Sequence, residues 1–413
     1  MKCSCCEGVK LQRLFSLGSI PPVNDFIEAS QIPAEKGYPL ELFFCQDCAL
    51  VQLGERVPPV SLFSHYLHIS SASTANIAHL KEVAGLIKQR HGSDLSKARV
   101  LEIGANDGTL LKMFKNENAD VLGVDPAKNL GKIVKDQGLD VIVDFFSEKL
   151  GQEIRKNRGA YDWVVALNVV AHTPDFVSLL RGVTATLAPD GQFMLENAYV
   201  VETILKGQFD TIYHEHVYCF SLSALRHAFE KAGLKITDAE IIPTQGCSIR
   251  VFGALASSSR QPTPRVAALL AAEQQKGFLD VNSYSEVSRK VTAFRTDLRA
   301  KIQALNTKFG NKAIGLGAPA RGVVVLNYCG LGTNDLELVI DDTPLKQGRL
   351  VPGMHIPVRG WDALTALPEG PRAYILLSWN YSKDMLERLR KHVKNGVVIV
   401  PFPELMEVAV AES

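Results

Sequence analysis

The sequence predicts an α/β protein in which a small cysteine-rich module precedes two domains built on open, mostly parallel sheets. Three observations carry this prediction: two C-x-x-C pairs, a strand, glycine turn and helix near residue 100, and a second series of apolar strands after residue 310. A chain of 413 residues is too long for one hydrophobic core, so two or three domains are expected. We place them at residues 1–75, 76–258 and 259–413.

Charge and hydropathy argue against several classes of protein. The 45 Lys and Arg residues are balanced by 44 Asp and Glu residues, so the chain lacks the basic surface that non-specific nucleic-acid binding requires. The start of the chain lacks the apolar run of a secretory leader, and no apolar stretch of about 18 residues could span a membrane. We therefore expect a cytoplasmic protein without nucleic-acid or membrane partners, whose cysteines are thiols or metal ligands.

Cys3, Cys6, Cys45 and Cys48 form two C-x-x-C pairs, a pattern typical of structural zinc. Each pair presents two thiolates to one ion, and four thiolates close a tetrahedral shell without an open position for water. The loop between the pairs is longer than the roughly 15–20 residues of simple zinc ribbons. Cys5 competes with Cys6 for one ligand position, and the spacing favours Cys6.

The run EIGANDG at residues 102–108 follows an apolar strand and precedes a helix, and a second strand then ends in Asp125 and Pro126. A carboxylate at this place can accept hydrogen bonds from ribose hydroxyls. Dinucleotide-binding domains carry G-x-G-x-x-G at such a turn, whereas Glu102 suits a cationic cofactor without phosphate. The turn resembles motif I of class I S-adenosylmethionine-dependent methyltransferases, with Asn106 in place of the usual middle glycine.

Further strands are expected in the order of that fold. Residues 141–148 supply the end of a third strand, where an adenine could lie, residues 161–172 supply a fourth strand, and residues 187–197 lead into a fifth. The candidate cofactor-binding residues in these turns are Glu102, Gly104, Asn106, Asp107, Gly108, Asp125, Pro126, Asp144, Phe145 and Asn168.

The run Tyr-His-Glu-His at residues 213–216 is the densest group of proton-transfer side chains in the sequence. It follows the fifth strand and precedes a probable helix, where the active-site loops of open α/β sheets collect. His214 and His216 are two residues apart and cannot share one face of a helix, which favours proton transfer over metal binding. His172, at the end of the fourth strand, could approach the same cleft.

Several runs together resemble the sugar C-3 methyltransferases of deoxysugar biosynthesis, over essentially the whole chain and in the same order. The runs are the cysteine pairs, LFSHYLHISS at 62–71, EIGANDG at 102–108, NVVAH at 168–172, YHEH at 213–216, GAPA at 317–320, LNYCG at 326–330, KQG at 346–348, PGMHIP at 352–357 and SWN at 378–380. The resemblance implies S-adenosylmethionine as methyl donor, a structural Zn²⁺ ion, and a nucleotide-linked 4-keto-6-deoxy sugar, carried on dTDP or GDP, as substrate.

The same resemblance implies roles for the catalytic residues. His216 abstracts the proton at C3, next to the ketone, with Glu215 beside it, and Tyr213 and His172 lie near the sugar. A carbon acid must become an enolate before it attacks a sulfonium methyl, so this chemistry needs a base and hydrogen-bond donors at the C4 oxygen. Tyr66 helps to enclose the methyl donor.

Two runs depart from the pattern of this family. TQGCSIR at residues 244–250 stands where the family tends to show HGGSLR, and Tyr66-Leu-His68 replaces the usual Y-x-Y. Both changes bear on the choice of sugar or nucleotide and leave the expected base in place.

Residues 261–310 are expected to form bridging helices, after which strands alternate with helices in a second α/β domain. The run GLGAPA at residues 315–320, followed by Asp341 or Asp342, could be taken for a dinucleotide-binding turn, but Ala320 occupies the place of the third fingerprint glycine. We favour a domain that holds the nucleotide sugar, with Arg321 or Lys346 as phosphate partner.

Two other functions fit parts of the sequence. A zinc-module methyltransferase acting on RNA or protein predicts a basic face, which the charge balance does not provide. A non-enzymatic assembly protein that used both α/β domains for binding would leave residues 213–216 without a role. Methylation of a nucleotide-linked keto sugar accounts for more of the sequence than either alternative.

Overall fold

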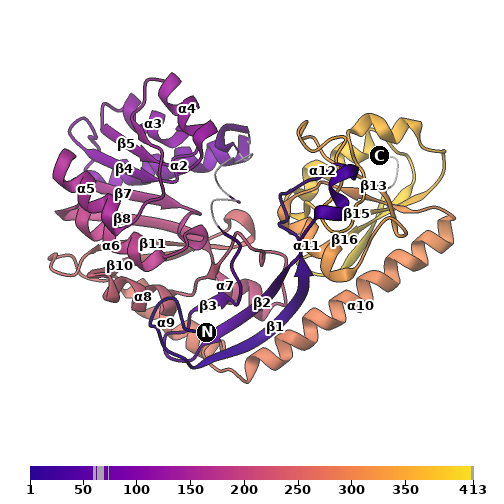
Figure 1. The fold of residues 1–413 in the computed structure, drawn as a ribbon, viewed down its shortest axis with the longest axis horizontal. Helices are drawn as coiled ribbons and strands as arrows, with labels where there is room; N and C mark the ends of the chain where they lie inside the picture. Colours follow the sequence, from indigo (N-terminus) through magenta and orange to yellow (C-terminus); the bar gives the residue numbers. More distant parts are fainter. Residues whose placement is uncertain (59–61, 63–68, 73, 411–413) are drawn as a thin grey trace.

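The computed structural model describes residues 1–58, 62, 69–72 and 74–410, and it confirms the predicted α/β class. Figure 1 shows two α/β bodies as the arms of a V, with the N-terminal sheet at its base. The described residues form one four-stranded, one seven-stranded and one six-stranded sheet. The two larger sheets belong to the two arms, so the space between the arms is bordered by all three parts of the chain.

The N-terminal sheet is antiparallel, in the order β1-β2-β3-β9. Its strands are β1 (Leu11–Ile20), β2 (Tyr38–Cys45), β3 (Val51–Leu53) and β9 (Tyr218–Cys219). Leu40, Leu42 and Phe44 alternate with more exposed residues on β2, so one face of the hairpin enters the core. The last strand comes from a segment more than 160 positions later in the sequence, directly after the Tyr-His-Glu-His run.

The seven-stranded sheet of the middle domain has the order β10-β11-β8-β7-β4-β5-β6, and only β11 runs antiparallel to its neighbours. The strands are β4 (Arg99–Ile103), β5 (Asp120–Val124), β6 (Val141–Ile142), β7 (Tyr161–Leu167), β8 (Leu187–Ala198), β10 (Leu234–Ile242) and β11 (Ser248–Leu255). The chain reverses direction across the sheet between β4 and β7. Ligands of open α/β sheets bind at such a point, beyond the carboxyl ends of the strands.

Helices cover both faces of this sheet, and their starts are set by local side chains. Ser147, Asp175 and Ser221 are N-caps whose side chains accept hydrogen bonds from backbone N–H groups in the first turns of α5, α6 and α8. The helices are α2 (Thr74–His91), α3 (Thr109–Asn116), α4 (Lys128–Asp136), α5 (Glu148–Arg158), α6 (Phe176–Thr186), α7 (Val200–Leu205) and α8 (Leu222–Lys231).

The C-terminal sheet has the order β14-β13-β12-β15-β16-β17 and is parallel except for β17. Its strands are β12 (Ala313–Leu316), β13 (Leu336–Ile340), β14 (Val358–Arg359), β15 (Arg372–Leu376), β16 (Gly396–Val400) and β17 (Met406–Val410). The helices α11 (Ala320–Cys329) and α12 (Ser382–Arg390) accompany these strands. Here the reversal lies between β12 and β15, so this domain has a crevice equivalent to that of the middle domain.

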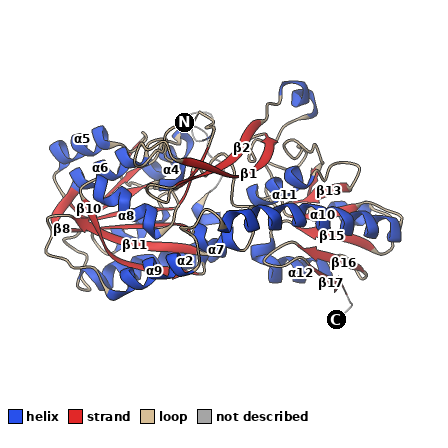
Figure 2. Ribbon diagram, turned by 90° about the horizontal axis from the view of Figure 1, so that it is seen from below, coloured by secondary structure: helices blue, strands red, loops and turns tan. Residues whose placement is uncertain are grey.

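Two helices join the arms. α9 (Pro264–Gln275) packs on α8 and β10 of the middle domain, whereas the 27-residue α10 (Ser283–Phe309) packs on β1, α11 and β15. Figure 2 shows α10 lying along the C-terminal sheet. Among the described residues, no helix is long and apolar enough to cross a bilayer.

Gly151→Ala should destabilise the middle domain, because α5 and α6 approach each other through glycines. A Cβ at Gly151 would lie 2.6 Å from Gly182 Cα, so the helices would have to separate, at a cost of about 1–3 kcal/mol. Gly85→Ala on α2 is the control, since nothing lies within 4 Å of its added Cβ, and it should stabilise by about 0.5–1 kcal/mol. The midpoints of urea unfolding measure both effects, and equal shifts would contradict the close packing of α5 on α6.

Candidate active site and zinc centre

The structure gathers the four cysteines predicted to hold zinc. The Sγ atoms of Cys3, Cys6, Cys45 and Cys48 all lie within 4.8 Å of one another, and the Cys3–Cys48 and Cys6–Cys45 pairs are each 3.5 Å apart. Thiolates around one tetrahedral zinc ion, with Zn–S bonds of about 2.3 Å, are separated by roughly this distance. Cys5 is buried nearby but is not part of this group.

Local backbone hydrogen bonds shape the thiolate pairs. Gly8 N–H donates to Cys6 Sγ and Cys5 N–H donates to Cys3 Sγ, both at 3.4 Å. Burial raises the pKa of Cys45 to about 11. Four sulfurs so close together, three of them on buried residues, cannot all be charged without a cation, so the donor set fits a divalent ion.

A cleft of about 1460 Å³ opens between the arms, and its lining comes from the N-terminal module and both α/β domains. Two groups of predicted site residues face this cleft. One is the glycine turn of the middle domain with the strand ends beside it, and the other is the Tyr-His-Glu-His segment. The following paragraphs treat these two groups in turn.

The glycine turn between β4 and α3 depends on residues with positive φ. Gly104 has φ +75°, and a Cβ there would lie 2.2 Å from Val169 Cγ2, so a larger residue does not fit. Asn106 takes φ +50°, a conformation that asparagine tolerates better than most residues. Its backbone N–H donates to Asp125 Oδ2 at 2.9 Å, and Ala127 N–H donates to Asp125 Oδ1 at the same distance. The carboxylate at the end of β5 therefore fixes the turn at the end of β4.

Glu102 supplies the test of whether this turn fits S-adenosylmethionine. It is 5% exposed, its Oε2 atom has no hydrogen-bond partner among the described residues, and it lines the cleft. Burial, together with the charges of Asp125 and Asp107, raises the pKa of Glu102 well above its usual value. The cleft residues that the middle domain contributes include carboxylates and no Lys or Arg. Such an acidic pocket suits a sulfonium and an ammonium group, and not a pyrophosphate.

Most of the predicted cofactor residues line this side of the cleft. They are Glu102, Gly104, Asn106, Asp125, Pro126, Asp144, Phe145 and Asn168. Asp107 and Gly108 are not among the lining residues: Gly108 is the N-cap of α3, and the carboxylate of Asp107 accepts hydrogen bonds from Thr109 and from the backbone N–H of Ser71. Tyr66 lies outside the described residues.

His216 is held in one tautomer by the backbone. Its Nδ1 atom lies 2.6 Å from the carbonyl oxygen of Thr211, and a carbonyl can only accept, so Nδ1 carries the proton. Nε2 is then an acceptor, and the Tyr213 hydroxyl lies 3.0 Å from it. Burial lowers the pKa of His216 to about 4, with a contribution from the positive charge of Arg321. At neutral pH the imidazole is therefore uncharged and able to accept a proton.

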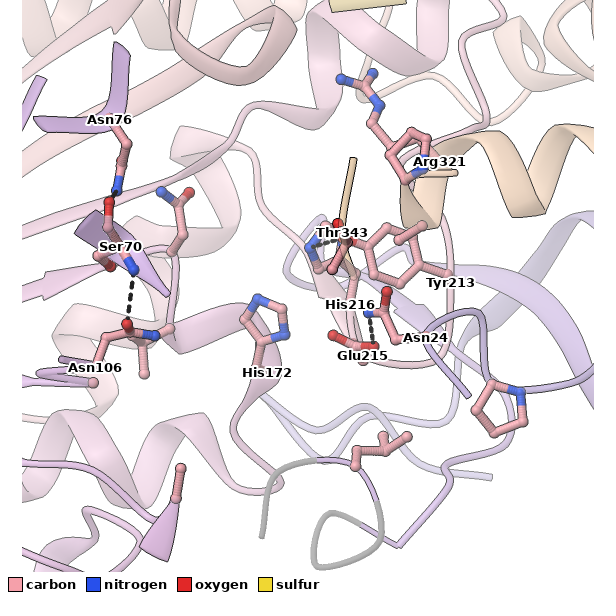
Figure 3. A pocket seen from close by; sticks show the side chains of 18 of the residues that line it. Asn24, Ser70, Asn76, Asn106, His172, Tyr213, Glu215, His216, Arg321 and Thr343 are labelled. Carbon is pink, nitrogen blue, oxygen red and sulfur yellow. Dashed lines mark hydrogen bonds between the residues drawn. The ribbon is translucent and has the colours of Figure 1, made fainter. Parts of the chain in front are cut away.

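Glu215 and His172 complete the group around His216. Glu215 is 4% exposed, burial raises its pKa to about 7, and Asn24 of the N-terminal module donates a hydrogen bond to Oε1. The ring of His172 meets that of His216 edge to face at 4.8 Å between centroids, and burial lowers the pKa of His172 to about 3. In Figure 3, His172 lies between this group and the glycine turn at Asn106. The structure thus brings the four predicted catalytic residues into one cleft.

The two predicted phosphate partners have different surroundings. Arg321, on the first turn of α11, pairs with the fully buried Asp210 through two hydrogen bonds of 2.9 and 3.2 Å. Lys346 lines the cleft, donates to the Ala318 carbonyl at 2.8 Å, and has a pKa that burial lowers. Arg321 is therefore already paired with an anion of the chain, and Lys346 is the better placed of the two to meet a phosphate.

A charged network lies behind His79 of α2, which lines the cleft. His79 Nε2 lies 2.6 Å from Glu196 Oε2, and the buried Arg250 of β11 pairs with Glu196 and Glu82. The hydrogen bond to Glu196 raises the pKa of His79. Arg250 is the last residue of the TQGCSIR run, in which the sequence alone indicated only a departure from the family pattern. Through its ion pairs with Glu82 and Glu196, it connects α2 to the sheet that carries the glycine turn.

Sequence reasoning missed several residues that touch the catalytic group. Asn24 reaches Glu215 across 191 positions, and His214 donates through Nε2 to the Tyr38 carbonyl at 3.1 Å. Asp210 and Thr211 precede the Tyr-His-Glu-His run, but nothing in their spacing marks a site. These contacts follow from how the N-terminal sheet is completed by β9, and no local pattern encodes that pairing.

Comparison with protein-family models assigns a description to each part of the chain. Residues 3–63 match a zinc binding domain, residues 75–239 match a methyltransferase domain, and residues 243–403 match the C-methyltransferase C-terminal domain.

Individual proteins extend this result. The chain is 34% identical to C-methyltransferase NovU of Streptomyces niveus over 408 residues, which cover 98% of this chain and 96% of the relative. The ubiquinone biosynthesis O-methyltransferase of Acinetobacter baylyi is 24% identical over 166 residues, covering 36% of this chain and 68% of that protein. The solved magnesium protoporphyrin IX methyltransferase of Synechocystis, with bound SAM, has 14% identity and a TM-score of 0.33, covering 43% of this chain and 78% of that one.

The methyltransferase domain and its relatives define the class: the chain is an S-adenosylmethionine-dependent methyltransferase with a structural zinc centre. Within that class, the match over nearly its whole length shows that the chain belongs to the C-methyltransferase family. The predicted resemblance, enzyme class and two cofactors are thereby confirmed.

Cys6→Ser should lower the zinc content below one ion per chain, because it removes one of four thiolates from a closed shell. Cys5→Ser is the matched control, since Cys5 is adjacent and buried but lies outside the cluster, and it should retain one ion. Metal analysis of both purified variants measures the difference. Loss of zinc from Cys5→Ser alone would show that Cys5 replaces Cys6 as a ligand.

Proposed function

We propose that this C-methyltransferase adds a methyl group at C3 of a nucleotide-linked 4-keto-6-deoxy sugar, carried on dTDP or GDP. The observation that supports it best is an uncharged imidazole, His216, whose accepting Nε2 faces the same cleft as the acidic cofactor turn. Methylation at carbon needs a base that removes a proton from a weak carbon acid, and a proton next to a ketone is acidic enough for such a base.

His216 is the proposed base, and its Nε2 takes the C3 proton. In the absence of substrate this atom faces the Tyr213 hydroxyl, so the C3–H group replaces that contact when the sugar binds. The pKa of about 4 is low for a base, but a diphosphate in the cleft favours the imidazolium and opposes the effect of burial. The proton stays on Nδ1 throughout and is donated to the Thr211 carbonyl, which keeps Nε2 directed at the substrate.

Tyr213, Glu215 and His172 are proposed to surround the reacting sugar. The Tyr213 hydroxyl, once released from His216, can donate to the C4 oxygen, where negative charge develops in the enolate. Glu215, with a pKa of about 7, can exchange a proton near neutral pH. Bound S-adenosylmethionine would supply an electrophilic methyl group, held by Glu102 and Asp125 with the glycine turn, and Tyr66 is proposed to help enclose it.

Each of the three parts of the chain then has a separate proposed role. We propose residues 1–75 as the zinc module, residues 76–258 as the cofactor domain, and residues 259–413 as the domain for the nucleotide carrier, in a cytoplasmic enzyme. The lysines and arginines that line the cleft support this division, because Arg321, Lys346 and Arg388 come from the C-terminal domain, Lys36 comes from the N-terminal module, and the middle domain contributes none. Lys346 is the proposed partner of the carrier phosphates.

Incubation with S-adenosylmethionine and a panel of dTDP- and GDP-linked 4-keto-6-deoxy sugars tests the function. We expect a product heavier by one CH₂ unit in the mass spectrum, with the new methyl group on C3 by NMR. No product from any sugar, with cofactor binding intact in a thermal-shift assay, would move the acceptor to another class such as RNA or protein.

His216→Asn should lower kcat by at least about 100-fold while the Kd for S-adenosylmethionine stays unchanged, because the variant loses the base and keeps the cofactor turn. His227→Asn, on α8 and away from the cleft lining, is the control and should retain the wild-type rate. Steady-state kinetics and calorimetry measure the two quantities. Full activity of His216→Asn would remove this residue from the role of base.

A further inference from the structure

A buried carboxylate links the C-terminal domain to the backbone that holds His216. Asp210 is 0% exposed, and its Oδ2 atom accepts from Arg321 Nε at 2.9 Å and from Trp379 Nε1 at 2.7 Å. Arg321 also donates to Oδ1 at 3.2 Å, and its guanidinium carbon lies 4.6 Å from the centroid of the Trp379 ring. A buried anion held by three donors from two C-terminal segments has little freedom to move.

Asp210 directly precedes the residue that accepts a hydrogen bond from His216, so its anchoring bears on the proposed base. The next residue is Thr211, whose carbonyl oxygen accepts the Nδ1 proton of His216 at 2.6 Å. On the other side, Phe209 is fully buried and its ring packs with those of Tyr328 and Phe402 in the C-terminal domain. The peptide that sets the tautomer of His216 is therefore anchored on the C-terminal arm, although it belongs in sequence to the middle of the chain.

A third part of the chain closes over this group. Gly246 ends the turn η4 (Thr244–Gly246) between β10 and β11, with φ +88°. A Cβ at Gly246 would lie 3.2 Å from a terminal nitrogen of Arg321 and 3.3 Å from the ring of Trp379. A turn of the middle domain thus lies against the guanidinium and the indole, so both arms contact this group.

We propose that Asp210, Arg321 and Trp379 form a positioning group that fixes the tautomer and orientation of His216 through the Thr211 carbonyl. None of the three is a catalytic residue in this proposal, since they act through the backbone. The inference rests on the proposed role of His216 as base. It makes the C-terminal domain necessary for proton abstraction as well as for binding the carrier.

The charges of this group also reach His216. The titratable side chains in contact with its ring are His172 and Tyr213, and Glu215 is its neighbour in the chain. Burial lowers the pKa of His216 most, and the Arg321 cation lowers it further by its charge. Asp210 neutralises that cation in the wild-type protein. Removing the anion or the cation should therefore shift the titration of His216 in opposite directions.

Asp210→Asn and Arg321→Gln test the proposal. Both should lower kcat by about 10-fold or more, because the Thr211 carbonyl loses its anchor, while the Kd for S-adenosylmethionine is unchanged. The acidic limb of the pH profile of kcat/KM should move to lower pH in Asp210→Asn and to higher pH in Arg321→Gln, each by up to about one unit. If Asp210 and Arg321 only stabilised the fold, both variants would lose activity or stability, but the acidic limb of the pH profile would not move in opposite directions in the two variants.

A second readout does not depend on turnover. The ¹⁵N NMR spectrum of histidine-labelled protein at neutral pH, with His216 assigned from the His216→Asn variant, should show the Nδ1–H tautomer in the wild type and a mixture in Asp210→Asn. If the wild type methylates no sugar, the proposed function fails, but this spectrum still tests the positioning group. Unchanged limbs together with an unchanged tautomer would overturn the proposal.

Two more variants guard against misfolding and non-specific effects. Trp379→Phe keeps an aromatic ring and removes only the indole N–H that donates to Asp210. It should therefore lower kcat less than Arg321→Gln does, and it should not move the acidic limb of the pH profile to lower pH. Asp238→Asn is the control, because Asp238 is another buried carboxylate paired with two arginines, Arg90 and Arg265. It lies outside the cleft lining and should reduce the melting temperature while leaving the limb and the tautomer unchanged.

Discussion

The hydrogen bond between His216 Nδ1 and the Thr211 carbonyl depends on a short stretch of backbone that other parts of the chain hold from both ends. Before this stretch, Phe209 and Asp210 are anchored in the C-terminal domain. After it, β9 completes the N-terminal sheet by pairing with β3. A buried imidazole keeps a fixed tautomer only where its acceptor cannot move, so the zinc module and the C-terminal arm both contribute to the site.

Because the site depends on the N-terminal sheet in this way, the zinc centre contributes to the geometry of the site. The thiolates of Cys45 and Cys48 lie at the turn between β2 and β3, so an ion there fixes the strand that pairs with β9. The same module provides Asn24 to Glu215 and the Tyr38 carbonyl to His214. An ion bound by these cysteines can in this way set the geometry of the loop that carries the predicted catalytic residues.

The two arms share one structural device at their strand ends. In the middle domain Asp125 accepts from the backbone of Asn106 and Ala127, and in the C-terminal domain Asp341 accepts from Ala318 and Thr343. Each carboxylate fixes the turn that follows the first strand of its sheet, at the point where strand order reverses. The charges beside the two turns differ: the middle domain contributes carboxylates and neither Lys nor Arg to the cleft, whereas the C-terminal domain contributes Lys346 together with Arg321 and Arg388, which pair with Asp210 and Asp342. One architecture thereby presents an acidic turn in one arm and a turn of mixed charge in the other.

The sequence by itself determined the parts whose signals are local. Cysteine pairs, the EIGANDG turn and apolar strands are set by bonding and backbone rules that act over a few residues, so the fold class, the cysteine cluster and the glycine turn between strand and helix could be predicted. The Tyr-His-Glu-His run stood out for the same reason. Only the tertiary structure decided that Asp107 supports the turn from outside the cleft, that Arg321 pairs with Asp210, and that Asn24 meets Glu215. Those contacts join residues that are far apart in the chain, and their partners are selected by the packing of three sheets and not by any repeating pattern.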